Sequence, residues 1–283
     1  MTIDNIIQAI LSENSELTKA QILEILAIEK SKTGGLISDE TLLRVVAAKR
    51  GVKLPHAKIY NCRLSISQLI PIMHDVTVVG RIVAIYPVKS YEGKKPGKYA
   101  SLLIADEECI LRVMLWNDKT SIVESGELKI GQIARFSHAY TREDRYGKPE
   151  LHLGAKSLIE VDPQNVNETD FPLINHFLKN CGDITYAQAD VYLAGRVKEV
   201  YPSSTFIRQD QTSGKALRFV LADDSGQVSV VAWNGKAGEL EPILKQGVEL
   251  YLVNAKAKSG SDGNVEVHVD ATTFVDFSTS REQ

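Results

Sequence analysis

The chain contains two tryptophans, and each one closes an apolar run just before an asparagine. The first run reads LRVMLWN over 111–117 and the second reads VSVVAWN over 228–234. An indole ring offers a flat apolar face that stacks on other rings, and a single N–H donor. These residue types therefore favour binding chemistry over covalent catalysis.

Residues suited to catalysis do not gather anywhere in the sequence. No nucleophile–base pair, metal-ligand cluster or phosphate-cradling glycine loop is evident, so an enzyme is the least expected class, and no cofactor or metal is expected. The three cysteines, Cys62, Cys109 and Cys181, are scattered without a CxxC pair. This pattern indicates reduced thiols in a reducing compartment and argues against a zinc site.

Composition places the chain among folded proteins without a strong charge bias. It has 283 residues, a hydrophobic content of 43% and a net charge of -3. Total charge therefore neither favours nor excludes a polyanionic partner. Residues 1–4 lack the basic start of a signal peptide, and no apolar stretch reaches membrane-spanning length. We expect a soluble, cytoplasmic (nucleoid-associated) protein.

The surroundings of the two tryptophans repeat as well. Residues 76–82 (VTVVGRI) match 191–197 (VYLAGRV) at an offset of 115 residues, counted from 76 to 191. Residues 98–106 match 215–223 at an offset of 117, which also separates the two tryptophans. Loop-length variation explains such small differences in offset, whereas chance similarity would not keep the order. The chain therefore holds two related modules.

Each module carries the strand pattern of one barrel type. A long strand with a mid-strand glycine ends at Tyr-Pro; two apolar strands joined by an acidic turn follow, then a short helical stretch and two final strands. Five strands with a helix between the third and fourth describe the oligonucleotide/oligosaccharide-binding (OB) barrel. We predict a mainly β protein with two tandem OB-fold barrels behind a small all-α N-terminal domain. The expected boundaries are 1–58 for the helical domain, 66–161 for the first barrel, 162–187 for the linker and 188–277 for the second barrel.

The helical domain is predicted to hold three short helices. Thr18 is expected to cap the second helix, Gly34-Gly35 to follow it as a break, and Gly51 to cap the third. A helix-turn-helix or interaction module and a purely structural cap both remain open, because the third helix offers few basic side chains for recognition. The expected apolar faces are Ile22, Leu23, Leu26 and Ile28 on the second helix, and Leu42, Val45, Val46 and Ala48 on the third.

Strand alternation separates the tryptophans from the barrel cores. Successive side chains of a strand point to opposite faces. In the third strand of module one, Arg112 and Trp116 therefore lie opposite the Leu/Val set, and in module two Ser229 and Trp233 do the same. A tryptophan belonging to the core would have joined the Leu/Val set. Both rings are expected on an open polar face, which is the ligand face of this barrel class.

Other rings and cations extend this surface over neighbouring strands and loops. An exposed base can stack on a ring for roughly 1–3 kcal/mol, and cations neutralise phosphates without reading sequence. Packing roles for the rings and solvated roles for the lysines are the alternative interpretation. Phe136 is included although its strand does not separate into two faces. The candidate nucleic-acid-binding residues are Arg81, Lys89, Lys94, Lys95, Lys98, Tyr99, Arg112, Trp116, Phe136, Arg142, Arg145, Tyr146, Lys148, Arg196, Lys198, Phe206, Arg208, Lys215, Arg218, Trp233 and Lys258.

These motifs resemble archaeal replication protein A, a family of single-stranded DNA-binding proteins. The resemblance rests on Gly-Arg in the first strand, Ala-Asp at the acidic turn and Trp-Asn after the third strand, and on GGLISDE at 34–40. It implies stacking roles for Trp116 and Trp233, for Tyr146 before Gly-Lys, and approximately for Tyr99. Module two departs from the pattern, because 259–263 contains no aromatic residue. The chain also lacks the zinc-binding cysteine cluster of many relatives, which is consistent with a shorter variant or one subunit of an assembly.

The resemblance implies a non-enzymatic protein that coats and protects exposed DNA strands in replication, repair and recombination. Its expected partners are single-stranded DNA and other replication protein A subunits or replication and repair proteins, and no membrane. Two alternatives share the fold: an RNA- or tRNA-binding protein, and a protein–protein adaptor subunit of a nucleic-acid complex. Because Trp116 has more aromatic and basic neighbours than Trp233, we expect the first barrel to bind more strongly.

Overall fold

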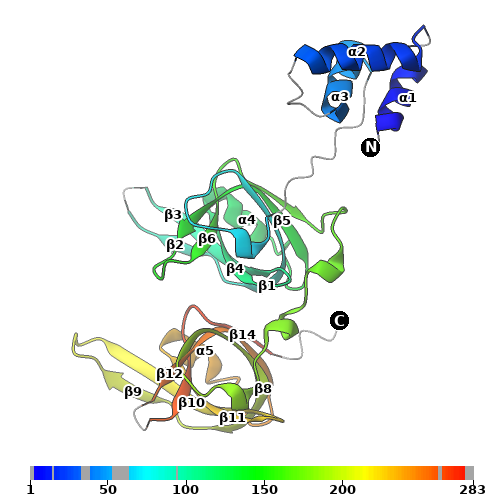
Figure 1. Cartoon of the computed structure of the whole chain (residues 1–283). Helices are drawn as coiled ribbons and strands as arrows, with labels where there is room; N and C mark the ends of the chain where they lie inside the picture. Colours follow the sequence, from blue (N-terminus) through cyan, green and yellow to red (C-terminus); the bar gives the residue numbers. More distant parts are fainter. Residues whose placement is uncertain are drawn as a thin grey trace. The chain divides into compact units, whose positions relative to one another are not determined.

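The computed structural model describes residues 3–14, 16–32, 39–52, 64–93, 95–260 and 263–277. The chain consists of two compact units, Met1–Arg63 and Leu64–Gln283 (Figure 1). Lys94, Cys62 and the expected break at Gly34-Gly35 lie outside the described residues. Within those residues, no helix has the length and apolar character needed to cross a bilayer.

The first unit is helical, with α1 (Ile3–Glu13), α2 (Lys19–Lys32) and α3 (Asp39–Lys49). Thr18 caps α2 as expected: its hydroxyl accepts a 3.4 Å hydrogen bond from the Gln21 N–H, and its own N–H donates to Gln21 Oε1 at 2.9 Å. This reciprocal pair satisfies two backbone donors at the helix start. Gly51 ends α3 with a φ of 75°, which confirms its predicted capping role.

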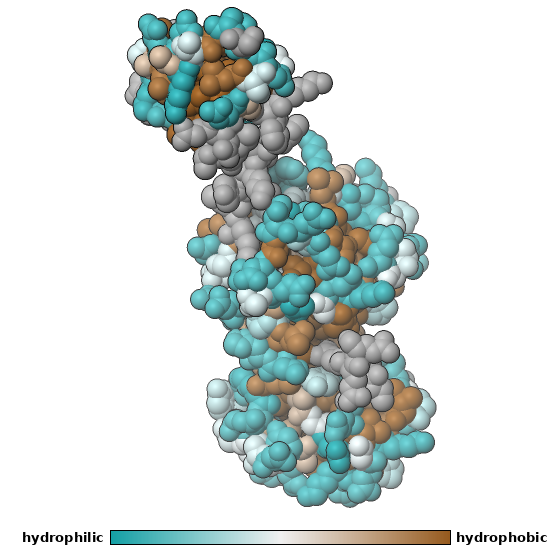
Figure 2. Space-filling model, turned by 90° about the vertical axis from the view of Figure 1, so that its right-hand side faces the viewer, coloured by the Kyte–Doolittle hydropathy of each residue, from teal (hydrophilic) through white to brown (hydrophobic). Residues whose placement is uncertain are grey.

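The apolar faces of α2 and α3 differ from the prediction. Leu23, Ile28 and Val45 are 44%, 49% and 42% exposed, whereas Leu43 and Ala47 are fully buried. Residues four apart lie above one another on a helix, so the 43/47 pair joins the 42/46 pair in one stripe and position 45 turns away. Brown hydrophobic patches are visible on the helical unit in Figure 2.

The first barrel closes with five strands. These are β1 (Val76–Ile85), β3 (Gly97–Ala105), β4 (Ile110–Trp116), β5 (Ile133–Glu143) and β6 (Pro149–Leu153). The strands pair in the order β1-β3-β4-β6-β5, with β4 and β6 parallel. Because β1 also pairs with β5, the five strands form a closed barrel. The additional elements are β2 (Lys89–Tyr91), α4 (Ser121–Glu124) and β7 (Leu158–Val161).

The second barrel repeats this arrangement. Its closing strands are β8 (Gln188–Val200), β10 (Ser213–Asp223), β11 (Gly226–Trp233), β12 (Glu249–Ser259) and β13 (Val265–Val269). The additional elements of this barrel are β9 (Ser204–Ile207), α5 (Gly235–Leu240) and β14 (Phe274–Phe277). The parallel pair is β11 with β13. The predicted fold class, mainly β with two OB-like barrels behind N-terminal helices, is confirmed.

The mid-strand glycines allow the first strand of each barrel to bend against its neighbour. A Cβ at Gly80 would lie 3.0 Å from Ile104 Cβ, and one at Gly195 would lie 2.8 Å from the Ala222 carbonyl oxygen. Both contacts are tighter than ordinary Cβ contacts, so a side chain at either position would force its neighbour to shift. The repeated glycine of the sequence is therefore a packing requirement of barrel closure.

A separate apolar cluster joins the two barrels inside the second unit. Tyr86 of the first barrel packs with Val253 and Phe274 of the second, and Ile174 of the linker is buried among them. The Tyr86 hydroxyl donates a 2.8 Å hydrogen bond to the Thr272 carbonyl oxygen. Burial raises the pKa of Tyr86, which keeps the phenol protonated as a donor. The part of the linker around Ile174 and Phe177 thus packs at this junction.

Candidate nucleic-acid interface

Trp116 and Trp233 lie at the ends of β4 and β11, half-buried and outside the barrel cores. The core faces predicted for both strands are confirmed, because Leu115 and Ala232 are fully buried in those cores. The asparagine after each tryptophan turns the chain with a positive φ, a conformation that asparagine tolerates. Its side-chain oxygen accepts from a backbone N–H at the start of the preceding strand, at 3.3 Å in the first barrel and 3.4 Å in the second.

A second aromatic ring meets each tryptophan edge-on. Tyr91 on β2 lies 5.9 Å from Trp116 at 80°, and Phe206 on β9 lies 5.9 Å from Trp233 at 90°. Each ring rests on a glycine of the next strand: a Cβ at Gly97 would lie 2.5 Å from the Tyr91 hydroxyl, and a Cβ at Gly214 would lie 2.3 Å from Phe206 Cζ. The glycines make room for the rings, so the same aromatic pair is built twice.

A histidine holds the indole nitrogen in both barrels. Trp116 Nε1 donates to His152 Nδ1 at 3.1 Å, and Trp233 Nε1 donates to His268 Nδ1 at 3.1 Å. The planes of the first indole and its histidine are nearly parallel, at 17°, with ring centroids 6.0 Å apart. The histidines come from β6 and β13, the strands that run parallel to the tryptophan strands.

An arginine–glutamate pair completes each cluster. Glu150, two residues before His152, lies 3.7 Å from the Arg112 guanidinium, and Glu266 forms an ion pair with Arg218. Arg112 lies on β4 and Arg218 on β10, so the arginine has moved to the neighbouring strand while keeping its glutamate partner. Both arginines are therefore on the outer face, as predicted.

The first barrel carries more rings than the second. Tyr99 faces Trp116 across the β3–β4 pair at 5.9 Å, and Tyr140 stacks on His152 at 5.4 Å. The residue paired with the histidine in the second barrel is Lys256, where the first has Tyr140. A groove of roughly 660 Å³ lies between the two barrels. Its lining includes Tyr99, Arg112 and Tyr146 of the first barrel and Asp190 and Lys256 of the second.

Four predicted cations of the first barrel have no ion-pair partner among those identified in the described chain, and two of them, Lys89 and Arg145, line this groove. Lys89 and Lys95 are exposed on and after β2, and Arg142 and Arg145 lie over the rings of Tyr140 and Tyr146 at 5.3 Å and 4.7 Å. Tyr146 is 64% exposed. A ring held under a guanidinium at a loop tip is available for stacking.

Other predicted cations are already paired with acidic or polar groups. Lys98 bridges Glu124 at 2.7 Å, Lys215 bridges Glu241, and Arg208 donates to Asn234 at 2.6 Å while lying over Phe206. Lys148 bridges Asp190, and that hydrogen bond raises the pKa of Lys148. Lys258 is exposed opposite Glu266 on the β12–β13 pair.

Arg81, Arg196 and Lys198 lie away from the tryptophans, so the structure does not bring them together with the rest of the predicted site. Arg81 faces Ala105 on β3 and Arg196 faces Ala222 on β10, each six residues along the strand from the residue opposite the tryptophan. At about 3.3 Å per residue this is about 20 Å.

These three cations have structural partners instead. The Arg81 guanidinium donates to the carbonyl oxygens of Phe171 at 2.7 Å and Gly131 at 2.5 Å, which fastens the linker to the first barrel. Arg196 pairs with Glu249 at 2.5 Å, and Lys198 donates to Gln227 at 2.7 Å.

Phe136 is a core residue, and its prediction as a binding residue is wrong. Its side chain is 0% exposed and packs inside the first barrel with Ala134 and Ala139. The buried positions of β5 shift from even to odd numbers because His138, with a φ of 53°, inserts an extra residue into the strand. Asn254 on β12 does the same with a φ of 64°. Strict alternation therefore fails in the fourth strand of both barrels.

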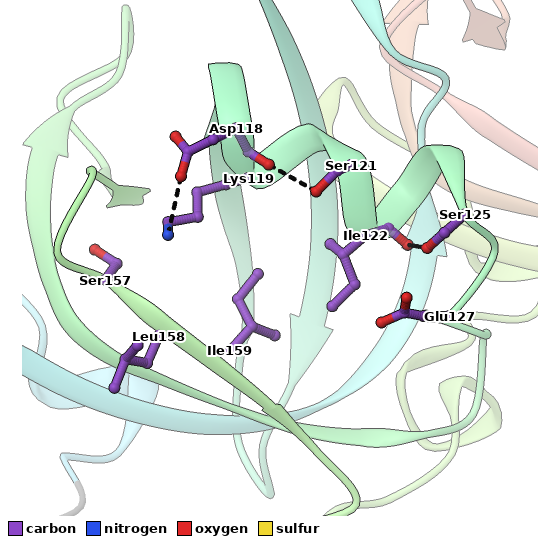
Figure 3. Close-up of a pocket in the computed structure, with 9 residues that line it drawn as sticks. All are labelled: Asp118, Lys119, Ser121, Ile122, Ser125, Glu127, Ser157, Leu158 and Ile159. Atoms are coloured by element: carbon purple, nitrogen blue, oxygen red, sulfur yellow. Dashed lines mark hydrogen bonds and ion pairs between the residues drawn. The ribbon is translucent and has the colours of Figure 1, made fainter.

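A second hollow, of about 540 Å³, lies between α4 and β7 (Figure 3). None of its nine lining residues is aromatic, and its one cation, Lys119, is bridged to Asp118 at 3.1 Å. It offers nothing on which a base stacks. In the described parts of the chain, no group of three histidine, cysteine or acidic side chains is placed to hold a metal ion.

Sequence reasoning missed the residues that support the tryptophans. These are Tyr140, Glu150, His152, Glu266 and His268. A signal for the last four was present, because Glu-Leu-His and Glu-Val-His repeat at an offset of 116 residues, from 152 to 268.

Comparisons with known proteins agree with this fold. Residues 191–275 match the family model named for the tRNA anticodon and described as an "OB-fold nucleic acid binding domain". The chain is 25% identical over 205 residues to Replication factor A of Methanothermobacter thermautotrophicus (strain Delta H), covering 71% of this chain. The resemblance to archaeal replication protein A is thereby confirmed. The chain spans about a quarter, 25%, of that relative's length.

Among solved structures, one chain of a replication protein A heterotrimer bound to single-stranded DNA superimposes with a TM-score of 0.54. The two are 15% identical, and the match covers 76% of this chain and 51% of that one. This likeness shows the shared fold. The chain accordingly corresponds to part of these larger proteins.

Proposed function

We propose that this chain is a non-enzymatic protein that binds single-stranded DNA and coats exposed strands during replication, repair and recombination. The observation that carries the proposal is the duplicated outer-face cluster: a half-buried tryptophan with an edge-on ring and a histidine, built in both barrels. Two such platforms in one chain suit successive unpaired bases, because any base can stack on a ring. The similarity to Replication factor A supports the same function.

Binding would combine stacking with phosphate neutralisation. Bases lie on the tryptophan clusters, while Lys89 and Arg145 neutralise phosphates along the groove and Arg142 does so beside Tyr140. A handful of nucleotides per barrel is expected, on the order of 4–16 each. Because both barrels belong to one chain, engagement of the first raises the effective concentration of the strand at the second.

A second candidate is RNA binding on the same surface. One observation favours it, namely that the model matching 191–275 takes its name from the tRNA anticodon. The barrel and the stacking platforms do not by themselves distinguish the ribose of RNA from the deoxyribose of DNA.

A salt series of binding titrations separates these functions. Single-stranded DNA, duplex DNA and single-stranded RNA of one sequence are titrated against the full chain. We expect single-stranded DNA to bind most tightly, with an affinity that falls linearly in log[salt] as phosphates release counterions. Equal or tighter binding of RNA would select the second candidate. No binding of any strand at low salt would instead favour a protein–protein adaptor.

A further inference from the structure

The two tryptophan–histidine pairs are built alike in two different surroundings. The Nε1–Nδ1 distance is 3.1 Å in each, although Trp116 is flanked by Tyr91, Tyr99 and a nearly parallel His152, whereas Trp233 has Phe206 and a tilted His268. In both barrels the histidine lies one strand away and two residues back from the position beside the indole. Retention of one bond while the flanking rings differ indicates that the bond itself matters.

The hydrogen bond from the indole N–H determines the protonation state of the histidine. An indole N–H only donates, so Nδ1 must accept, and the imidazole is neutral with its proton on Nε2. Burial is the largest cause that lowers the pKa of His268. The positive charges of Lys258 and Arg218 lower this pKa further, and the negative charge of Glu266 raises it. The resulting pKa, below the usual value, agrees with a neutral acceptor.

The histidines themselves have limited access to a ligand. His152 is 5% exposed, and its Nε2 is buried without a hydrogen-bond partner, 3.6 Å from Glu150 Oε2. Tyr140 stacks on the imidazole with ring centroids 5.4 Å apart, and the Trp116 indole N–H meets the Nδ1 edge of the same ring. A residue so enclosed acts on a bound strand through its neighbour rather than by direct contact.

We infer that His152 and His268 are positioning residues, which fix the orientation of the stacking tryptophans by accepting the indole N–H. This rests on the proposed function of the tryptophans and deepens it. An indole attached to a strand end otherwise samples several rotamers, and ordering one such side chain on binding costs about 0.5–1.5 kcal/mol. Each histidine removes that cost before the strand arrives.

Two substitutions of His152 separate the effect of the hydrogen-bond acceptor from the effect of the flat ring. His152→Phe keeps a flat ring beside Tyr140 and Trp116 but removes the acceptor, whereas His152→Asn keeps an oxygen acceptor near the position of Nδ1. His176→Phe, at an exposed histidine in the linker, is the matched control. His268→Phe and His268→Asn repeat the pair in the second barrel, where the histidine is less enclosed.

Nuclear magnetic resonance reads the bond directly, because the chain has one tryptophan per barrel and therefore two indole N–H signals. In ¹⁵N-labelled full chain, His152→Phe should move the Trp116 indole signal upfield and leave that of Trp233 in place. His152→Asn should restore most of the shift. Affinity for single-stranded DNA should fall about fivefold in His152→Phe, the factor expected for one ordered side chain, and recover in His152→Asn.

The outcomes divide cleanly. An unmoved indole signal, or unchanged affinity in a folded His152→Phe protein, overturns the inference while the proposed function stands. If the wild-type chain fails to bind single-stranded DNA, the proposed function falls and takes the inference with it. If His152→Phe does not fold, the same two readouts on the His268 variants decide the matter.

Discussion

Aromatic residues of the barrels divide into two roles according to the face that they occupy. Trp116 and Trp233 lie half-buried on the outer face, whereas Phe136 and Phe219 fill the barrel cores with no more than 1% of their surface exposed. A core ring contributes to stability through the apolar surface that it removes from water. An outer ring contributes less, because part of its surface stays in contact with water.

Phe136→Ala and Trp116→Ala should therefore differ in stability. Phe136→Ala should lower the free energy of unfolding by about 3–5 kcal/mol, because it leaves a cavity in the first barrel. Trp116→Ala should lower it by about 1 kcal/mol. Chemical denaturation of the full chain measures both values. Equal losses would mean that the indole is a core residue, and the stacking account of Trp116 would fail.

At the scale of elements, a repeated aspartate joins the turn after the second strand to the chain that enters the barrel. Asp106 Oδ2 accepts from the Ile66 N–H at 2.6 Å, and Asp223 Oδ2 accepts from the Cys181 N–H at 2.7 Å. Burial alone would raise the pKa of Asp223, but hydrogen bonds from Ser225 and Cys181 outweigh it and lower the pKa to about 2. The aspartate of the acidic turn therefore has a structural role: in each barrel it forms a clasp, a hydrogen bond between this turn and the chain that enters the barrel.

This clasp predicts a pH-dependent difference between two variants. The folded pKa of Asp223 lies below its unfolded value near 4, so its contribution is present above pH 4 and is lost as the pH falls toward 2. Asp223→Asn should lower the melting temperature at pH 7 and match the wild type near pH 2. Asp224→Asn, at the exposed neighbour, should have little effect at either pH. A pH-independent effect of Asp223→Asn would contradict this assignment.

Elements with strict alternation were predictable from the sequence, and elements with a bulge were not. The core residues of β3, β4, β10 and β11 lie two apart, so the tryptophans could be assigned to the outer face. Burial itself does not alternate in all four strands, because outer-face Leu103 on β3 and Val231 on β11 are buried as well. β5 and β12 change period at His138 and Asn254, residues whose positive φ no local pattern announces. Arg81 lies on the same face as the tryptophan, but it pairs with Ala105, six residues along β3 from Tyr99, which faces Trp116. That separation follows from the pairing register of the strands, which the sequence alone does not specify. The histidines required the repeat to be followed through the last strands.

At the scale of the whole molecule, the two binding platforms are unequal. The first barrel adds Tyr99, Tyr140 and exposed Tyr146 to its tryptophan, whereas the second adds Phe206 and carries Lys256 in place of Tyr140. Several cations of the second barrel are also engaged with acidic side chains of the same barrel. The first barrel should therefore contribute more of the binding free energy, with the second adding to it because both are held in one chain.

Binding titrations with single-stranded DNA show whether the two tryptophans carry strand binding. They compare the affinity of the wild-type chain with that of Trp116→Ala, Trp233→Ala and the double variant. One stacked base is worth roughly 1–3 kcal/mol, so Trp116→Ala should weaken binding about tenfold or more. Trp233→Ala should weaken it less, and the double variant should bind more weakly than either. Melting temperatures near the wild-type value confirm that the variants are folded. Wild-type affinity in the folded double variant would contradict the account, because strand binding would then lie elsewhere on the molecule.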